Sequence, residues 1–267
     1  MPEITSFSNP QVKNVVKLRT DRRHRQVEGL TLVEGQYEVE MAFNSGVVPQ
    51  RVFICEELCK NTLMTNNDVE VIPVSRPVFE KMSHRENPDG VLAIIITPER
   101  SVLNLRTPPS PLYILVEAVE KPGNLGAVFR TADAAGVDGV LVCDTCVDLF
   151  NPSVIRASRG TVFSVPCAEV SNEDALAWLR AKRIKTLAAS PQGDKNYADA
   201  DLWKPVCLAF GAEDAGLTDY WLDNSDQRIK IPMLGTVNSL NVSTSAAIIL
   251  YEALRQRIEK HQAARHP

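Results

Sequence analysis

Apolar residues recur along the chain in short runs that alternate with polar stretches. In the first third, the strand-like runs are LTLVEG, RVFICEE, VEVIPVS and GVLAIII, and the helix-compatible stretches between them are QYEVEMAFNSG and RPVFEKMS. This alternation predicts a small α/β unit. Four prolines and scattered charges at 97–111 then interrupt every regular pattern. We therefore expect two domains, over residues 1–98 and 112–267, joined by a linker at 99–111.

Beyond the linker the apolar runs become nearly continuous. They read LYILVE, GVLVC, TVFSVPC, KTLAAS, VCLAFG and RIKIPM, and helix candidates such as LGAVFRTADAAG and NEDALAWLRAKR lie between them. Strands of this kind predict a parallel sheet covered on both faces, with its ligand site beyond the carboxyl ends of the strands. A final helix is expected over about 242–261, with an apolar stripe through Ala246, Ile249, Leu250, Ala253, Leu254 and Ile258.

Composition places the chain among ordinary globular proteins, with 44% hydrophobic and 23% charged residues. No apolar run approaches the roughly 20 residues that span a bilayer, and the start MPEITSFSNPQ has no signal-peptide core. We expect no membrane contact and a cytoplasmic location, with six reduced cysteines. Cys143 and Cys146 form a CxxC, but no second pair follows at zinc-finger spacing, so no metal is expected.

The charges are unevenly distributed. A net charge of −4 argues against a protein that coats nucleic acid indiscriminately. A local basic patch nevertheless lies near the N-terminus, and it comprises Lys13, Lys17, Arg19, Arg22, Arg23 and Arg25. It is a candidate RNA-binding surface, and a solvated helix face explains such a run equally well.

Three glycine-containing segments of the second domain carry the candidate chemistry. The first, EAVEKPGNLGAVFRTA at 117–132, runs from a strand through Asn124 into a helix that holds Arg130. Glycines and a helix start can receive an anionic ligand, although plain turn chemistry also explains them. Arg130 lies among small and apolar residues, so it either snorkels from the core or points into a functional crevice.

The other two segments follow later strands. In VCLAFGAEDAGL at 206–217, Glu213 comes just after a strand that ends at Gly211, where it can bond a ligand or hold a cation such as Arg130. In IKIPMLGTVNSLNVSTSAA at 229–247, a loop rich in Ser and Asn precedes a helix. One such residue can cap the helix, but this many can also bind a polar ligand.

Missing motifs narrow the chemistry. The chain has no GxGxxG after its first strand, no GxxxxGK[ST] and no GxSxG. Dinucleotide binding, P-loop hydrolysis and serine hydrolase chemistry therefore lose support. All four histidines lie outside the three segments, so an imidazole general base is not expected.

Together, NLGAVFRTA, FGAEDAGL and IPMLGTVNSLNVS resemble the three ordered motifs of the SpoU-type RNA ribose 2′-O-methyltransferases of the SPOUT superfamily. The resemblance spans roughly residues 112–260. Residues 4–35 are similar, more loosely, to the RNA-recognition domain that many ribosomal RNA methyltransferases and thiostrepton-resistance enzymes carry. Thr244 and Ser245 stand where the third motif often has smaller residues.

The resemblance implies a C-terminal α/β domain with a deep trefoil knot and S-adenosylmethionine held among the knot loops. Family positions imply a catalytic role for Arg130, which Asn124 positions, and an RNA-side role for Glu213, Ser239 and Asn241. The positions implied for the cofactor are Ser190, Gly211, Ala212, Ile231, Met233, Leu240 and Val242.

The resemblance also implies a homodimer formed through the catalytic domain. The expected substrate is a ribose in structured RNA, with large-subunit ribosomal RNA of the 23S type favoured because a recognition domain with a basic start precedes the catalytic one. A transfer RNA 2′-O-methyltransferase, a non-catalytic RNA-binding protein of the same fold and, more distantly, a metabolic enzyme that binds another nucleotide remain alternatives.

Overall fold

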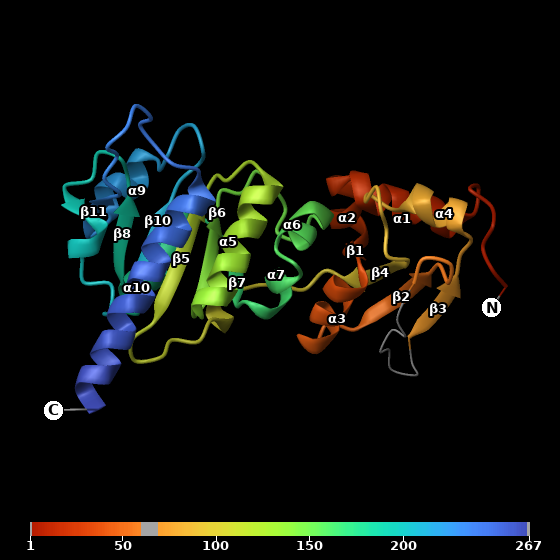
Figure 1. The fold of residues 1–267 in the computed structure, drawn as a ribbon, viewed down its shortest axis with the longest axis horizontal. Helices are drawn as coiled ribbons and strands as arrows, with labels where there is room; N and C mark the ends of the chain where they lie inside the picture. The colour runs from red at the N-terminus through yellow and green to blue at the C-terminus, as the bar shows by residue number, and fades with distance from the viewer. Residues whose placement is uncertain (1, 60–68, 266–267) are drawn as a thin grey trace. The chain divides into compact units, whose positions relative to one another are not determined.

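The computed structural model describes residues 2–59 and 69–265. Their contacts divide the chain into two compact units, coloured along the chain in Figure 1. The N-terminal unit comprises Met1–Glu99 and Asp148–Ser164, and the C-terminal unit comprises Arg100–Val147 and Val165–Pro267. The sequence predicted domains that are continuous along the chain, whereas Asp148–Ser164 groups with the N-terminal unit.

The N-terminal unit is built on a four-stranded sheet of order β1-β4-β2-β3. Strand β4 pairs antiparallel with β1 and β2, and β2 pairs parallel with β3. The sequence prediction of a small α/β unit is thus confirmed. Its elements are α1 (Pro10–Thr20), α2 (Arg22–Glu28), β1 (Leu30–Glu34), α3 (Gln36–Asn44), β2 (Pro49–Ile54), β3 (Glu70–Pro73), α4 (Arg76–Met82) and β4 (Val91–Ile96).

Helix α1 shows how the sequence builds this unit. The Asn9 side chain caps the helix by accepting a bond from the Gln11 amide (2.8 Å), and Pro10 suits the first turn. Apolar side chains at helical spacing then enter a core shared with α4 and the sheet. The buried members from the two helices are Val12, Val15, Leu18, Val78, Phe79 and Met82.

Residues Asp148–Ser164 pack on β1 and α3 through α6 (Pro152–Ala157) and α7 (Thr161–Ser164). The Thr31 hydroxyl donates to the Phe150 carbonyl (2.7 Å), and the Phe150 and Phe163 rings stack with centroids 5.7 Å apart. The strand expected over TVFSVPC is wrong for its first half. TVFS is helical because its apolar side chains are buried in this unit, and β7 begins only at Cys167.

Arg25 is a structural cation rather than part of an RNA surface. Its side chain is 6% exposed, donates to the Leu18 carbonyl (2.8 Å) and pairs with Asp148 at 2.5 Å. A buried guanidinium needs such partners because removing a charge from water is costly. Arg25 therefore leaves the predicted RNA-binding set and joins α2 to the 148–164 segment.

Removing the partner of Arg25 is expected to destabilise the N-terminal unit selectively. In Asp148→Ala the buried guanidinium loses its counter-ion, which costs about 3 kcal/mol of unfolding free energy. All three tryptophans, at 178, 203 and 221, belong to the C-terminal unit. The urea midpoint measured by far-UV circular dichroism should therefore fall, while the midpoint measured by tryptophan fluorescence stays unchanged. Asp223→Ala, at an exposed ion pair with Arg228, is the control; equal curves for both variants would contradict the assignment.

The C-terminal unit confirms the predicted parallel sheet. Its seven strands have the order β7-β6-β5-β10-β8-β11-β9, and every pairing among them is parallel. The elements are η1 (Val102–Asn104), β5 (Leu112–Glu117), α5 (Pro122–Ala135), β6 (Gly139–Cys143), β7 (Cys167–Val170), α8 (Asn172–Ala181), β8 (Lys185–Ala189), β9 (Lys195–Asn196), η2 (Tyr197–Asp199), β10 (Val206–Phe210), α9 (Asp219–Asn224), β11 (Gln227–Lys230) and α10 (Val242–Arg265).

Helices cover both faces of this sheet, as expected. Helices α5 and α10 lie side by side over one face (Figure 1). On the other face, the Tyr113 ring meets Trp178 of α8 edge-on at 5.2 Å. All six residues of β5 are buried, so both faces of this central strand are packed. None of the helices in the described residues combines the length and apolarity needed to cross a membrane.

The second half of the predicted linker packs against the C-terminal unit. Leu105 is buried in the C-terminal core, and the Tyr113 hydroxyl donates to the Arg106 carbonyl. Arg257 of α10 donates to the carbonyls of Ser110 and Pro111 at 2.6 and 3.1 Å. Helix α10 thereby holds the chain just before β5. Its apolar stripe is buried from Ala246 to Ala253, and Ile258 is exposed.

Candidate functional site

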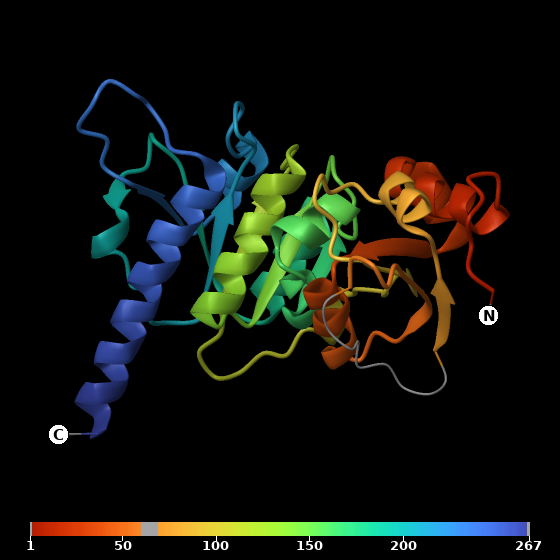
Figure 2. The same cartoon turned by 45° about the vertical axis from the view of Figure 1, so that its right-hand side comes forward.

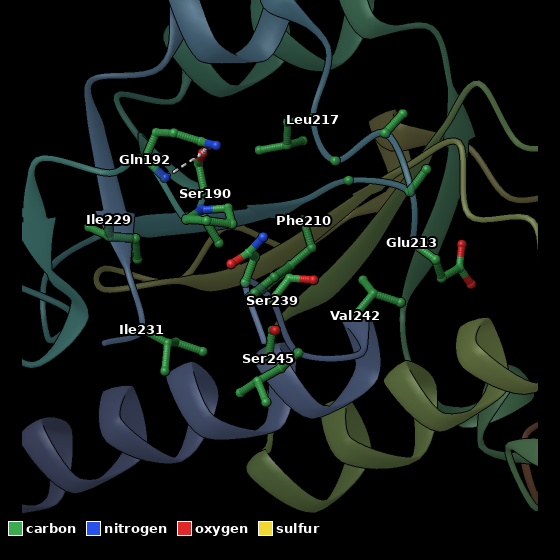
Figure 3. Close-up of a pocket in the computed structure, with 18 of the residues that line it drawn as sticks. Ser190, Gln192, Phe210, Glu213, Leu217, Ile229, Ile231, Ser239, Val242 and Ser245 are labelled. Carbon is green, nitrogen blue, oxygen red and sulfur yellow. Dashed lines mark hydrogen bonds between the residues drawn. The ribbon is translucent and has the colours of Figure 1, made fainter. Parts of the chain in front are cut away.

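A pocket of about 320 Å³ opens beyond the carboxyl ends of β8, β10 and β11. Three chain segments line it, at 189–192, 210–217 and 229–245, and Leu222 of α9 and Ile249 of α10 complete the lining. Figure 3 shows Ser190 and Gln192 at one end of the pocket and Glu213 at the other, with Phe210 between them. This is the sheet edge at which the parallel topology predicts a ligand site.

The first wall is a tight loop after β8. The Ser190 amide donates to the Ile229 carbonyl (2.9 Å), and its hydroxyl lies 2.9 Å from Gln192 Oε1. Gly193 closes this loop against the β11 chain, where a Cβ on Gly193 would come within 2.5 Å of the Ile229 carbonyl carbon. The two backbones therefore approach as closely as glycine permits. The sequence analysis singled out Ser190 here but not Gly193.

The second wall is a hairpin after β10. The amides and carbonyls of Ala212 and Gly216 bond reciprocally at 3.1 and 3.0 Å, and Gly216 has a φ of 72°. A Cβ on Gly211 would fall 1.9 Å from the Gly216 carbonyl carbon. Only glycine fits at position 211 unless the hairpin moves. The hairpin backbone thus sets the shape of this side of the pocket.

All seven residues that the resemblance implied for the cofactor line this single pocket. Three of them, Ser190, Gly211 and Ala212, follow strands of the sheet. Ile231, Met233 and Leu240 come from the long loop before α10, and Val242 is the first residue of α10. Most of these side chains are small or apolar, so polar recognition falls to backbone amides and carbonyls. The complete set is Ser190, Gly211, Ala212, Ile231, Met233, Leu240 and Val242.

Two side chains implied for the RNA side, Glu213 and Asn241, form a cluster with Asn124 at the Glu213 end of the pocket. The Asn124 amide donates to Glu213 Oε1, and the Asn241 amide donates to Asn124 Oδ1 at 3.2 Å. Glu213 Oε2 is buried without a hydrogen-bond partner among the described residues. Ser239 lines the same pocket. The structure therefore brings the first, second and third sequence segments together at this point.

Glu213 is held in its ionised form. Burial alone raises its pKa, but the Asn124 hydrogen bond, backbone hydrogen bonds and nearby Lys121 outweigh burial and lower the pKa below its usual value. A carboxyl whose folded-state pKa is lowered stabilises the fold above its unfolded pKa. That contribution is lost as the pH falls through the folded value. The cluster is thus arranged to present a carboxylate at neutral pH.

Asn241 also has a structural role. Its Oδ1 accepts bonds from the Ser243 amide (3.0 Å) and hydroxyl (2.6 Å) at the start of α10. One side chain therefore caps the helix through its oxygen and reaches Asn124 through its nitrogen. The helix-cap interpretation is thus confirmed for Asn241, and its part in a polar ligand site stays a prediction.

Arg130 lies apart from the pocket. It is exposed on α5, does not line the cavity, and its side chain makes no hydrogen bond or ion pair within the described part of the chain. The contacts expected for it are made differently: Glu213 holds Asn124 rather than the guanidinium, and Asn124 contacts Glu213 and Asn241 rather than Arg130. Within one chain, Arg130 is free to meet a ligand or a second molecule.

Sequence reasoning missed a buried carboxylate behind the hairpin. Glu117, fully buried at the end of β5, accepts bonds from the Thr218 amide (2.8 Å), the Thr218 hydroxyl (2.7 Å) and the Asn172 amide (2.9 Å). Asn172 in turn accepts from the Trp221 indole (2.6 Å). This network fixes Thr218, the residue just after the pocket hairpin. An acid that ends an otherwise apolar strand was the available signal.

Glu117→Gln is expected to destabilise the C-terminal unit by about 2 kcal/mol. An amide nitrogen would face the Thr218 or Asn172 donors, and hydrogen bonds to a buried charged group are worth roughly 1.5–3 kcal/mol. Urea unfolding followed by tryptophan fluorescence measures this, because Trp221 is part of the network. Exposed Glu120→Gln is the matched control; identical midpoints for the two variants would rule out a structural role for the carboxylate.

The six residues of the predicted basic patch have different surroundings in the structure. Lys13, Lys17, Arg22 and Arg23 are exposed. Arg19 instead donates to backbone carbonyls of Lys81 (3.1 Å), Met82 (3.2 Å) and Ser83, which ties α1 to the end of α4. Arg25 is buried, as described above. The exposed remainder of the patch stays a candidate RNA surface.

The described residues contain no cluster of three histidine, cysteine or acidic side chains suited to a metal ion. The pair in the CxxC is split, since Cys143 is buried and Cys146 is exposed. Burial, aided by nearby Asp144 and Glu117, raises the pKa of the Cys143 thiol far above its usual value. A protonated thiol is a poor metal ligand and nucleophile.

Two family models match the chain. Residues 111–251 match the SpoU rRNA Methylase family, and residues 9–93 match the MRM3-like substrate binding domain. Among curated proteins, the chain is 31% identical over 252 residues to the 23S rRNA (guanosine(2553)-2′-O)-methyltransferase RlmP of Bacillus subtilis, covering 94% of this chain and 98% of that protein.

Solved structures of methyltransferases are similar to this chain. An RNA 2′-O ribose methyltransferase is similar with a TM-score of 0.84 and 38% identity, over 96% of this chain and 100% of the other. The SpoU methyltransferase AviRb from Streptomyces viridochromogenes, in complex with the cofactor AdoMet, is similar with a TM-score of 0.87 and 30% identity. That match covers 94% of this chain and 100% of the AviRb chain.

Proposed function

The chain belongs to the SpoU rRNA Methylase family, and from that premise we propose that it methylates a ribose 2′-hydroxyl of large-subunit ribosomal RNA with S-adenosylmethionine as methyl donor. The observation that carries this proposal is the pocket at the strand ends. Its walls are backbone loops that present the seven implied cofactor residues, and a polar cluster of implied substrate residues stands at one end.

The lining of the pocket suits the cofactor. Apolar Ile231, Leu240 and Val242 suit the face of an adenine ring, and the free edges of the 211–216 hairpin and of the 189–192 loop offer backbone donors and acceptors to its polar edge. When bound, the cofactor supplies an electrophilic sulfonium methyl group. The protein's task is to hold that group in line with the attacking oxygen.

The polar cluster serves the nucleophile. We assign Asn124, Glu213, Ser239 and Asn241 to positioning the target ribose, with Glu213 Oε2 as an available acceptor for a hydroxyl proton. Arg130 carries a permanent charge, so we assign it to the flanking phosphate or to the alkoxide that develops as the 2′-hydroxyl loses its proton. Methyl transfer to oxygen then releases S-adenosylhomocysteine and one proton.

The proposal is tested by methyl transfer to defined RNA. Purified protein is incubated with labelled S-adenosylmethionine and either 23S-type ribosomal RNA, transfer RNA, or a ribosomal RNA fragment with a 2′-deoxy substitution at the mapped nucleotide. Label in ribosomal RNA that is lost in the deoxy fragment is the expected result. Label in transfer RNA alone would reject the substrate. Absence of label with every RNA, together with cofactor binding by calorimetry, would favour a non-catalytic RNA-binding protein.

We also propose that the N-terminal unit recognises the RNA, because it matches a substrate binding domain and carries the exposed cations Lys13, Lys17, Arg22 and Arg23. Neutralising Lys13 and Lys17 together should weaken RNA binding and lower its salt dependence by about two phosphate contacts, with cofactor affinity unchanged.

A cytoplasmic location suits this function. It also suits the six cysteines, all of which are described and none of which forms a disulfide.

A homodimer through α5 and α10 is part of the proposal. The exposed residues Arg130 and Tyr251 lie on these two packed helices, so a second copy on this face would bring an arginine to the interface. Light scattering should give twice the chain mass at micromolar concentration. A monomer mass under conditions where methyl transfer is active would reject the dimer.

We further propose that the chain is knotted, as the family resemblance implies. Supporting this are the close backbone approach of Gly193 to Ile229 and the contribution of residues 238–242 to the pocket just before α10. A circular permutant whose new ends lie within 231–240 tests the knot. Slow refolding of its C-terminal unit from denaturant is the expected result.

A further inference from the structure

A second hollow lies in the N-terminal unit, between the N-terminal segment, α1 and α4. Its volume is about 280 Å³, and Phe7, Val12, Val16, Lys13, Lys17 and Lys81 line it. This volume lies just below the roughly 300–1,000 Å³ range of small-molecule pockets, so it suits a ligand no larger than one nucleotide. The hollow is separate from the cofactor pocket and shares no residue with it.

The hollow is apolar within and basic at its rim. Phe7 is 56% exposed and lines the hollow, so its ring is accessible to a ligand that enters there. Lys13 and Lys17 stand one helical turn apart on α1, and Lys81 stands on α4. All three lysines are exposed, and none forms an ion pair with a described residue. The nearest acid on α4, Glu80, pairs with Arg76 at 2.9 Å.

The walls of the hollow are fixed in place. The Ile4 amide donates to the Pro73 carbonyl (2.9 Å), and the Ser75 amide donates to the Ile4 carbonyl (3.0 Å), so the first residues are bound beside the end of β3. In both cartoon views these residues run from the start of α1 to that edge of the sheet (Figures 1 and 2). Arg19 fastens α1 to the end of α4 through backbone carbonyls. Phe7 is therefore presented on an anchored turn.

We infer that this hollow binds one unpaired nucleotide of an RNA strand, with its base stacked on Phe7 and its flanking phosphates on Lys13, Lys17 and Lys81. An aromatic platform beside cations is the combination that binds single-stranded nucleic acid. A base within a duplex has both faces covered, so it cannot stack there. The inference rests on the proposed function, because it takes the RNA substrate as ligand, and it names the feature of that RNA which the N-terminal unit reads.

The inference also explains features that the catalytic site leaves unused. Lys81 lies outside the basic run of the sequence, yet the fold brings it beside Lys13 and Lys17. Phe7 is not a member of the hydrophobic core cluster of the unit, so its partly exposed ring adds little to the stability of that core. Together they place a stacking face and a positive rim on one side of the unit that matches a substrate binding domain.

Binding to short RNAs tests the inference on the full chain. The probes are a fluorescent single strand of roughly ten nucleotides, within the usual site sizes of such grooves, and a blunt duplex of the same length, both at fixed salt. Phe7→Ala should weaken single-strand binding about tenfold and leave duplex binding unchanged, and Phe7→Trp should restore it. Lys81→Gln should reduce the salt dependence by about one phosphate contact. Exposed Lys182→Gln in α8's cap is the charge control.

Equal single-strand affinity for Phe7→Ala and the unchanged protein would overturn the inference. So would an equal loss for single strand and duplex, which would assign the hollow to general phosphate contact. Circular dichroism melting shows whether Phe7→Ala still folds, and the tryptophan variant supplies a second test. Failure of the proposed function gives a different result. In that case the unchanged protein binds the single strand through Phe7 but shows no cofactor binding by calorimetry, which rejects methyl transfer and leaves the nucleotide site intact.

Discussion

Gly211→Ala is expected to abolish measurable binding of S-adenosylmethionine. Its Cβ would overlap backbone atoms of Gly216 and Leu217 at 1.9–2.0 Å, and backbone cannot turn aside as a flexible side chain can. The hairpin of 211–217 must shift, which removes one wall of the pocket. Overpacking of this kind costs about 3 kcal/mol in stability, and we expect cofactor affinity to fall at least about 100-fold, because the displaced backbone groups are the polar contacts proposed for the cofactor.

Isothermal calorimetry with S-adenosylmethionine and S-adenosylhomocysteine measures the affinity, and tryptophan fluorescence reports whether the C-terminal unit is folded. Gly123→Ala is the matched control, since a Cβ there meets nothing within 4 Å and the residue lies in helix α5, where alanine is favoured. Cofactor binding by Gly211→Ala equal to that of Gly123→Ala would show that the hairpin does not hold the cofactor.

Arg130→Ala is expected to remove about 90% or more of methyl transfer, in line with the roughly 10²-fold or larger contribution of a positioned group at a reacting centre. Cofactor affinity should remain intact because Arg130 does not line the pocket. Arg130→Lys should recover little activity, since lysine keeps the charge but loses the planar fork that binds phosphate or alkoxide in two places.

Single-turnover methyl transfer with saturating RNA measures the chemical step, and calorimetry measures the cofactor in the same preparations. Arg106→Ala, at another exposed arginine of the C-terminal unit, is the control. Unchanged turnover in Arg130→Ala would remove it from the site. A loss of turnover that disappears when the alanine variant is mixed with a chain carrying Gly211→Ala would show that one copy's Arg130 acts at the other copy's pocket.

Much of the architecture followed from pattern. The alternation of short apolar runs and helical stretches predicted an α/β unit followed by a parallel sheet, and both are present. These predictions hold because strands buried on both faces must be apolar throughout, whatever their order in the sheet. The resemblance of three short motifs to the SpoU-type enzymes is likewise confirmed by the match over 111–251.

The sequence pattern gave wrong predictions where the burial of a residue depends on contact with a distant segment. TVFS has the composition of a strand, but it lies in α7 because Phe163 stacks on Phe150 and both pack in the N-terminal unit. Arg25 belongs to a surface-like basic run, but its partner Asp148 stands 123 positions away. Neither contact has a local signal, since the partners are adjacent only after folding.

For the candidate site, the sequence by itself determined the chemical inventory and the sheet edge at which it lies. Gly211, Glu213 and Asn241 follow strands whose carboxyl ends meet at one edge, so their proximity was foreseeable. The tertiary structure alone decided which groups touch. It paired Asn124 with Glu213, left Arg130 exposed and added Lys81 to Lys13 and Lys17. The physical reason is that strand and helix periodicity are local properties, whereas hydrogen bonds and burial between distant segments depend on how the whole chain packs.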